Sequence, residues 1–271
     1  MTTRFERDTA IERLDDHVFG ARADVAWWVA RGPNGGYLAA IITRALTATV
    51  DDATRAPRSL TVHFAAPPEE GAVTITTAIE RSGRSLTSCS ARMEQGERLI
   101  AVAMAAYSSP RPGPEFCDVV VPDVPLPAAI DPMVPDPMAP PIAHRWETRW
   151  AVGRRPWSSE PPAREAVAGG WIRLEEPQGF DAPVIAAVTD AWIPPVFARS
   201  DQPYVVPTID LTVHFRRALP HPTIATADFL LAVFRTNAAA EGFLEEDGEV
   251  WAPDGTLLAQ SRQLATFLPL P

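Results

Sequence analysis

Cysteine is scarce in this chain. Its 271 residues include two cysteines, Cys89 and Cys117, and neither belongs to a CxxC pair or to a mixed cysteine and histidine spacing. A disulfide framework is therefore not expected, and the spacing gives no sign of a zinc site. We predict a protein without a bound metal or cofactor.

Long apolar runs and excess positive charge are missing as well. No uncharged apolar stretch approaches the length of a membrane span, and the opening MTTRFERDTAIERLDD is too charged for a signal peptide. The net charge of −10 argues against nucleic acid and anionic membrane surfaces as main partners. We therefore expect a globular protein of the cytoplasm.

Proline, by contrast, is abundant and concentrated in the middle of the chain. Eleven of the 32 residues from 110 to 141 are proline, and this stretch has no sustained hydrophobic period. Such a composition is typical of an extended linker. The sequence therefore predicts an N-terminal domain at residues 1–109, a linker at 110–141 and a C-terminal domain at 142–271.

The first half reads as an extended segment, a helix and a run of strands. The segment His17–Val29 ends at the break RGPNGG, Arg31–Gly36, and Tyr37–Val50 then follows the 3.6-residue helical period. Four strand-like runs separated by turn signals come next: Ser59–Ala66, Gly71–Glu80, Arg84–Glu94 and Arg98–Ser108.

The second half repeats this order around a helix expected at Asp181–Ile193. Its strand-like runs are His144–Val152, Gly170–Leu174, Val205–Arg216, Thr223–Arg235, Gly242–Trp251 and Thr256–Phe267. The pentapeptide LTVHF occurs at Leu60–Phe64 and again at Leu211–Phe215, each time in the first strand after the helix, which indicates an internal duplication. We predict an α+β double hotdog, in which two curved antiparallel sheets each wrap a helix and join edge to edge.

A single carboxylate interrupts the apolar pattern of the second helix. One turn before Asp190 are Ala186 and Ala187, and one turn after it is Ile193. Asp181 already stands at the N-cap position, and Asp190 lies near the C-terminal end, where the helix dipole disfavours negative charge. A base with a raised pKa and an ordinary structural residue explain this local pattern equally well.

Chemistry is expected where the duplicated halves differ. Alignment of ITRAL with VTDAW, of the LTVHF strands and of the closing strands singles out Asp190, Thr208 and Gln263. The equivalent positions in the first half are Arg44 (Thr43 in a register shifted by one), Pro57 and Ala105. One site per chain follows, in the C-terminal half.

These motifs resemble the thioesterase II (TesB-type) family of double-hotdog acyl-CoA thioesterases. The resemblance rests on GPNGGYLAA, LTVHF, VTDAW and DGTLLAQSRQ, and covers nearly the whole chain outside the proline-rich stretch. It implies a hydrolase of fatty-acyl-CoA in which Asp190, Thr208 and Gln263 activate a water molecule. The backbone N–H groups of Gly35 and Gly36, at the start of a helix, are candidates to hold the oxyanion.

Two other functions stay open at this stage. One is a non-catalytic hotdog protein that binds acyl-CoA or lipid. The other is a hotdog hydratase, whose Asp is followed five residues later by a His; this chain has Pro195 there, which counts against it. Relatives commonly associate, so the resemblance also implies a homo-oligomer.

Overall fold

A computed structural model describes residues 2–29 and 32–269. Arg31 of the predicted break and the terminal residues 1, 270 and 271 of the predicted domains lie outside the described residues. The first half contains α1 (Arg4–Asp8), β1 (Glu12–Asp15), β2 (Val18–Ala23), η1 (Val25–Trp27), α2 (Gly35–Val50), β3 (Ala56–Phe64), β4 (Gly71–Ser82), β5 (Leu86–Gln95) and β6 (Arg98–Ser108). The remainder contains η2 (Pro127–Ala129), η3 (Pro141–His144), β7 (Trp146–Val152), β8 (Ala166–Leu174), α3 (Ala182–Val188), η4 (Pro195–Ala198), β9 (Tyr204–Val205), β10 (Thr208–Phe215), β11 (Leu230–Thr236), β12 (Ala239–Ala240), β13 (Phe243–Trp251), β14 (Leu257–Thr266) and β15 (Leu268–Pro269).

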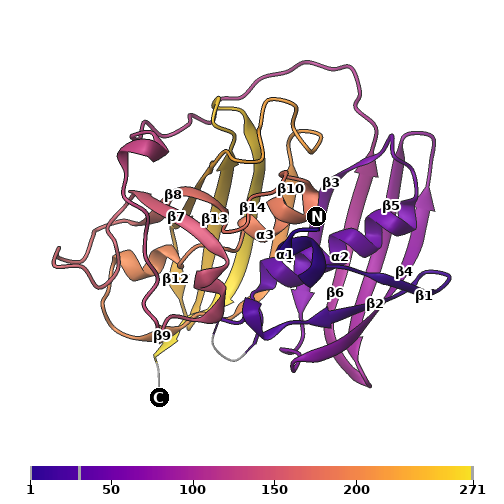
Figure 1. Cartoon of the computed structure of the whole chain (residues 1–271), viewed down its shortest axis with the longest axis horizontal. Helices are drawn as coiled ribbons and strands as arrows, with labels where there is room; N and C mark the ends of the chain where they lie inside the picture. Colours follow the sequence, from indigo (N-terminus) through magenta and orange to yellow (C-terminus); the bar gives the residue numbers. More distant parts are fainter. Residues whose placement is uncertain (1, 30–31, 270–271) are drawn as a thin grey trace.

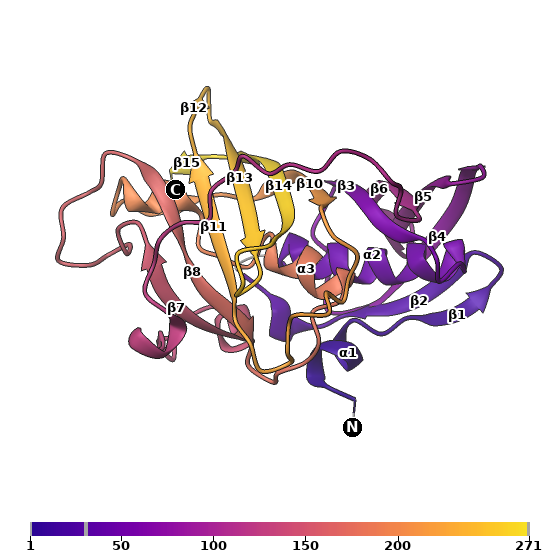
Figure 2. The same ribbon diagram turned by 90° about the horizontal axis from the view of Figure 1, so that it is seen from above.

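One antiparallel sheet of 13 strands crosses both halves of the molecule (Figure 1). Its order is β1-β2-β4-β5-β6-β3-β10-β14-β13-β11-β8-β7, with β12 beside β13. Each half of the sheet curves around its own helix, and both helices lie inside the curve (Figure 2). This arrangement confirms the double hotdog predicted from the sequence.

The two LTVHF strands form the seam between the halves. Strand β3 pairs antiparallel with β10, so that Leu60 faces Val213 and Val62 faces Leu211. At the centre of the seam the hydroxyl oxygens of Thr61 and Thr212 are 3.0 Å apart. Because identical pentapeptides pair in opposite directions, the seam has local two-fold symmetry, and the expected edge-to-edge joining of two sheets is confirmed.

The two helices pack side by side in opposite directions. The start of α2 meets the end of α3, where a Cβ built on Gly36 would be 2.6 Å from the Ala187 carbonyl oxygen. Farther along, Arg44 of α2 lies 3.8 Å from the Asp181 carboxylate at the start of α3. The positive end of the α2 dipole therefore faces the negative end of the α3 dipole.

Helix α3 is shorter than the predicted Asp181–Ile193. Asp181 caps its start as expected, accepting a hydrogen bond from the Val184 N–H at 3.0 Å, but the helix ends at Val188. The chain turns at the C-cap Thr189, and the Asp190 N–H donates to the Ala187 carbonyl at 3.2 Å. The helix thus ends where it meets the start of α2, before Pro194 and Pro195.

Two strands are also shorter than predicted. The run Val205–Arg216 divides into β9 and β10 around Pro207, which has no N–H to donate to a sheet. The run Thr223–Arg235 is ordered as a strand only from Leu230, because the Asp228 carboxylate accepts the Ala225 N–H at 2.7 Å and holds a turn. In the polar N-terminal arm, no sequence pattern indicated α1 or β1.

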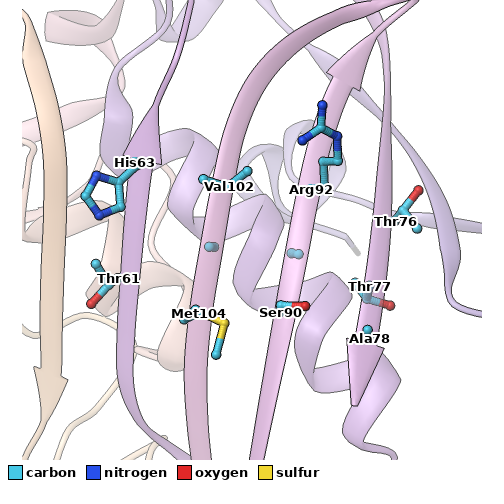
Figure 3. A pocket seen from close by; sticks show the side chains of 11 residues that line it. Thr61, His63, Thr76, Thr77, Ala78, Ser90, Arg92, Val102 and Met104 are labelled. Atoms are coloured by element: carbon cyan, nitrogen blue, oxygen red, sulfur yellow. The ribbon is translucent and has the colours of Figure 1, made fainter. Parts of the chain in front are cut away.

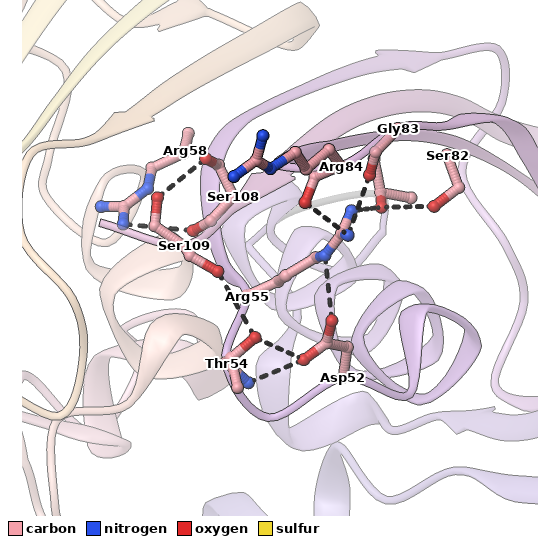
Figure 4. A network of polar contacts seen from close by, with 10 residues as sticks. Asp52, Thr54, Arg55, Arg58, Ser82, Gly83, Arg84, Ser108 and Ser109 are labelled. Carbon is pink, nitrogen blue, oxygen red and sulfur yellow. Dashed lines mark hydrogen bonds and ion pairs between the residues drawn. The ribbon is translucent and has the colours of Figure 1, made fainter. Parts of the chain in front are cut away.

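A polar network fixes the far end of α2 (Figure 4). The helix ends at Val50, and its C-cap Asp51 adopts the left-handed conformation with φ of 46°. The Arg55 guanidinium then donates to the Asp52 carboxylate at 2.9 Å and to the Gly83 carbonyl at 2.9 Å. This contact ties the loop after α2 to the hairpin between β4 and β5, so the position of α2 in the sheet is set from both ends.

The proline-rich segment packs against the second half of the sheet. Between Ser109 and Leu126 it contains no helix or strand, and the Trp171 indole N–H donates to the Pro125 carbonyl at 2.8 Å. Arg149 adds a hydrogen bond to the Pro127 carbonyl at 2.8 Å. The segment is thus held by its carbonyl groups, which proline retains although it lacks the N–H.

Candidate active site

Asp190 lies at the junction of the two helices. Its Oδ2 accepts the backbone N–H of Gly36 at 2.9 Å and the side-chain amide of Asn34, also at 2.9 Å. The same Asn34 amide donates to the Asp190 backbone carbonyl at 2.6 Å. Residues from the first half of the chain therefore hold the carboxylate that the second half supplies.

Asn34 makes two kinds of hydrogen bond, and it was not among the site residues predicted from the sequence. Its Oδ1 accepts the Tyr37 N–H at 3.1 Å and caps α2, while its Nδ2 holds Asp190. Asparagine is among the preferred N-cap residues, so an Asn directly before two glycines and an apolar helix was a readable signal. The bond to Asp190 depends on α3 and could not be read from the first half alone.

The two glycines of the GPNGG motif are required by close packing. A Cβ on Gly35 would be 2.9 Å from the Phe64 ring and 3.0 Å from Asp190 Oδ2. The Gly36 N–H, predicted to hold an oxyanion, is bonded to Asp190 in this structure. The glycines let the first turn of α2 approach the carboxylate closely enough for that bond.

Opposing effects act on the pKa of Asp190. The residue as a whole is half-buried, but protein atoms surround its carboxylate, and this desolvation raises the pKa to about 6. Hydrogen bonds from Gly36, Gln263, Gly35 and Asn34 lower it, without cancelling the effect of burial. The raised pKa agrees with the expectation from the apolar sequence around Asp190.

Thr208 and Gln263 meet on the inner face of the sheet, below Asp190. The Thr208 hydroxyl, at the start of β10, donates to Gln263 Oε1 at 2.8 Å. Gln263 is 6% exposed, and its side chain lies near enough to Asp190 to lower the pKa of that carboxyl. The structure thus brings the three predicted side chains together, with Thr208 bonded to Gln263.

A second buried carboxyl, Glu246 of β13, belongs to the same group and was not predicted. It lies directly opposite Gln263 in the β13–β14 pair and is 5% exposed. The Gln263 amide donates to Glu246 Oε1 at 2.7 Å. Glu246 occurs among Glu245, Asp247 and Glu249, so only the two-residue alternation of the strand, with Leu244 and Gly248 also buried, distinguishes it.

A separate hollow lies outside this site. It has a volume of about 400 Å³ on the first half of the sheet, and its lining includes His63, Val102 and Met104 (Figure 3). In Figure 3 α2 is behind these strands, so the hollow is on the face turned away from the helices. It shares no residue with the Asp190 group.

Comparison with protein families assigns both halves of the chain. Residues 24–108 match the model of the acyl-CoA thioesterase N-terminal domain, and residues 121–267 match that of the acyl-CoA thioesterase C-terminal domain. The chain belongs to the acyl-CoA thioesterase family. It is a thioester hydrolase, as the resemblance of its motifs predicted.

Solved structures support the same fold for this thioesterase. A hot dog fold protein of unknown function from Alicyclobacillus acidocaldarius is 27% identical, with 100% of both chains covered and a TM-score of 0.90. The acyl-CoA thioesterase II TesB2 of Mycobacterium marinum is 16% identical, with 98% of both chains covered and a TM-score of 0.77. The tesB protein of Mycobacterium avium subsp. paratuberculosis is 19% identical, with 98% of both chains covered and a TM-score of 0.79. A search of curated proteins by sequence finds no match.

Two further properties concern the described residues alone. Within residues 2–29 and 32–269, no helix combines the length and apolar character needed to cross a membrane. Across the same residues, no group of three or more His, Cys, Asp or Glu side chains has the arrangement of a metal site.

Proposed function

We propose that this thioesterase hydrolyses fatty-acyl-CoA to the free acid and coenzyme A, with a water molecule activated by Asp190, Thr208 and Gln263. The observation that supports the proposal is that the buried Asp190 carboxylate, with a pKa of about 6, stands beside the Gln263 amide, which is hydrogen-bonded to the Thr208 hydroxyl. Such a carboxylate is ionised at neutral pH, yet is a stronger base than an exposed aspartate.

In this proposal Asp190 takes a proton from the attacking water. The water oxygen forms a bond to the thioester carbon, and collapse of the tetrahedral intermediate breaks the carbon–sulfur bond. The proton held by Asp190 then passes to the departing thiolate sulfur, which gives the free acid and the thiol of coenzyme A and returns Asp190 to its ionised form. Thr208 and Gln263 orient the water, since a hydroxyl and an amide can each donate and accept.

The same proton transfer would free a donor for the oxyanion. While Asp190 is ionised, its Oδ2 holds the Gly36 N–H at 2.9 Å. A protonated carboxyl is a weaker acceptor, so this N–H, together with that of Gly35, becomes available to the thioester oxygen as negative charge develops there. The oxyanion role of the two glycines is thus coupled to the base role of Asp190.

The test is release of free thiol from a panel of acyl-CoAs of increasing chain length. The wild-type protein is compared with Asp190→Asn, which keeps an oxygen acceptor for Gly36 but cannot take a proton. We expect kcat to fall at least about a thousandfold in this variant, with little change in KM. Asp181→Asn, at the other end of α3, is the matched control, because asparagine caps a helix as well as aspartate does.

Two results would reject parts of the proposal. If acyl-CoA binds to the wild-type protein without thiol release at any chain length, the chain is a binding protein and the hydrolytic function is wrong. If Asp190→Asn and wild type release thiol at equal rates, hydrolysis stands but the site assignment fails. A homo-oligomeric state and a cytoplasmic location stay predictions.

A further inference from the structure

Glu246 is a buried acid for which the proposed mechanism has no task. It occupies an inward-facing position of β13, between Leu244 and Gly248, where strands of this sheet place apolar or small residues. A buried carboxyl is destabilising unless it is neutral or well bonded, so its presence here requires an explanation.

One amide group lies next to both Glu246 and Asp190. Gln263 Nε2 donates to Glu246 Oε1 at 2.7 Å, and the same side chain lowers the pKa of Asp190. The primary amide nitrogen carries two hydrogens, so one remains for the Asp190 carboxylate when the other is bonded to Glu246. The Gln263 oxygen is left for the Thr208 hydroxyl at 2.8 Å.

Within residues 2–29 and 32–269, the charged groups that act on the pKa of Glu246 are all acids: Asp190 from the end of α3 and the strand neighbours Glu245 and Asp247. Arg262 on β14 is bonded to Asp247 at 2.7 Å, and both side chains are on the opposite face of the sheet from Glu246. Leu244, on the same face of β13 as Glu246, packs in an apolar cluster with Val196 and Phe197, against which the phenol ring of Tyr204 also lies.

We propose that Asp190 and Glu246 form a carboxyl pair, bridged by the Gln263 amide, that holds one proton at neutral pH, so that Glu246 sets the charge of the hydrolytic site without touching substrate. This inference rests on the proposed function of Asp190. Burial, followed by the charge of Asp190, raises the pKa of Glu246 to about 8, which agrees with Asp190 ionising first.

The pair has a consequence for catalysis. With one proton present, the site carries a single negative charge when the thioester oxygen begins to acquire its own. When the pair loses this remaining proton, the site gains another buried negative charge. That charge repels the developing oxyanion and disfavours the transition state of hydrolysis. Glu246 is therefore a positioning residue that holds Gln263, and its ionisation switches the site off at high pH.

The test is the pH profile of kcat for hydrolysis of an acyl-CoA, with spontaneous hydrolysis subtracted. We expect the wild-type kcat to rise through pH 6 and to fall with a midpoint near pH 8, about tenfold by pH 9. Glu246→Gln should keep the rise and the KM but lose the fall, because glutamine bonds to Gln263 and cannot ionise. Asp247→Asn removes a charge from the neighbouring, outward position and should keep the alkaline fall, with its midpoint slightly lower, because the Asp247 charge is the weakest of those that raise the pKa of Glu246.

A second measurement separates this inference from the proposed function. In urea, the unfolding midpoint of Glu246→Gln relative to wild type should rise between pH 5 and pH 8, because only the wild type must keep a buried carboxyl neutral. If Glu246→Gln fails to fold, the urea midpoints of wild type and Asp190→Asn are compared across pH instead. Without the Asp190 charge, the pH at which ionisation of Glu246 changes the urea midpoint should move down by about 1 pH unit.

The outcomes are distinct. A wild-type enzyme that releases thiol, with an alkaline fall that persists in Glu246→Gln, overturns the carboxyl pair and leaves the hydrolase intact. Absence of thiol release with the expected urea behaviour rejects the hydrolase but supports the shared proton. Urea midpoints of wild type and Glu246→Gln that run parallel with pH overturn the pair on their own.

Discussion

Replacing the proposed base Asp190 with asparagine should make the protein more stable while inactivating it. In the folded chain the pKa of Asp190 is about 6, against 3.8 for an unperturbed aspartate. The unfolded chain therefore releases this proton more readily than the folded chain does. The contribution of protonated Asp190 to the free energy of unfolding is fully present below about pH 4 and is lost as the pH rises through 6.

The size of the effect follows from the two pKa values. A difference of about two units corresponds to roughly 3 kcal/mol of unfolding free energy at pH 7.5, where the folded carboxylate is ionised. A neutral asparagine side chain at this position would avoid that cost and still accept the Gly36 N–H. For a chain of this size, about 3 kcal/mol corresponds to a rise in Tm of roughly 6–12 °C.

Urea denaturation of wild type and Asp190→Asn at pH 4 and pH 7.5 measures the difference directly. We expect near-equal stability at pH 4 and a more stable variant at pH 7.5. Equal stability at both pH values would show that burial does not strain Asp190. A variant less stable at pH 7.5 would show that the ionised carboxylate stabilises the helix junction, contrary to the desolvation argument.

Three more substitutions test the surroundings of the carboxylate. Thr208→Val should lower kcat about 10- to 100-fold with little change in KM, since the hydroxyl that orients the water is lost, and Thr208→Ser should restore most of the rate. Asn34→Asp keeps the helix cap but adds a negative charge beside Asp190, so the acid limb of the kcat profile should move up by about 1 pH unit, whereas Asn34→Ser, which removes the amide donor without adding a charge, should move it up by less. Gly36→Ala would place a Cβ 2.6 Å from a backbone carbonyl of α3, and unfolding free energy should fall by about 1–3 kcal/mol together with activity; Gly179→Ala, with no atom within 4 Å of the added Cβ, should change neither.

Most of the fold was accessible from the sequence because it is duplicated. Apolar periods indicated the helices and strands of each half, and the repeated LTVHF indicated both the duplication and the strands at the seam. The errors were at element ends. Helix α3 stops at Val188, where it meets the start of α2, and no local pattern in the second half contains that information.

The site was accessible only in part, for the same reason. Asp190, Thr208 and Gln263 were distinguished by comparing the halves, and the structure places them together, with a hydrogen bond between Thr208 and Gln263. Asn34 was missed because its bond to Asp190 spans 156 positions of sequence. Glu246 was missed because nothing in an acidic stretch tells which carboxyl the sheet turns inward until the strand register is known.

The antiparallel packing of α2 and α3 gives the molecule two corresponding helix junctions, and they differ in charge. At one, the neutral cap Asn34 faces the acid Asp190. At the other, the acidic cap Asp181 faces the cation Arg44 at 3.8 Å, and Arg44 aligns with Asp190 in one of the two registers that relate the halves. An ion pair thus closes the second junction. The two junctions of this duplicated scaffold therefore offer one candidate site, and converting the second junction into another would require exchanging both members of that pair.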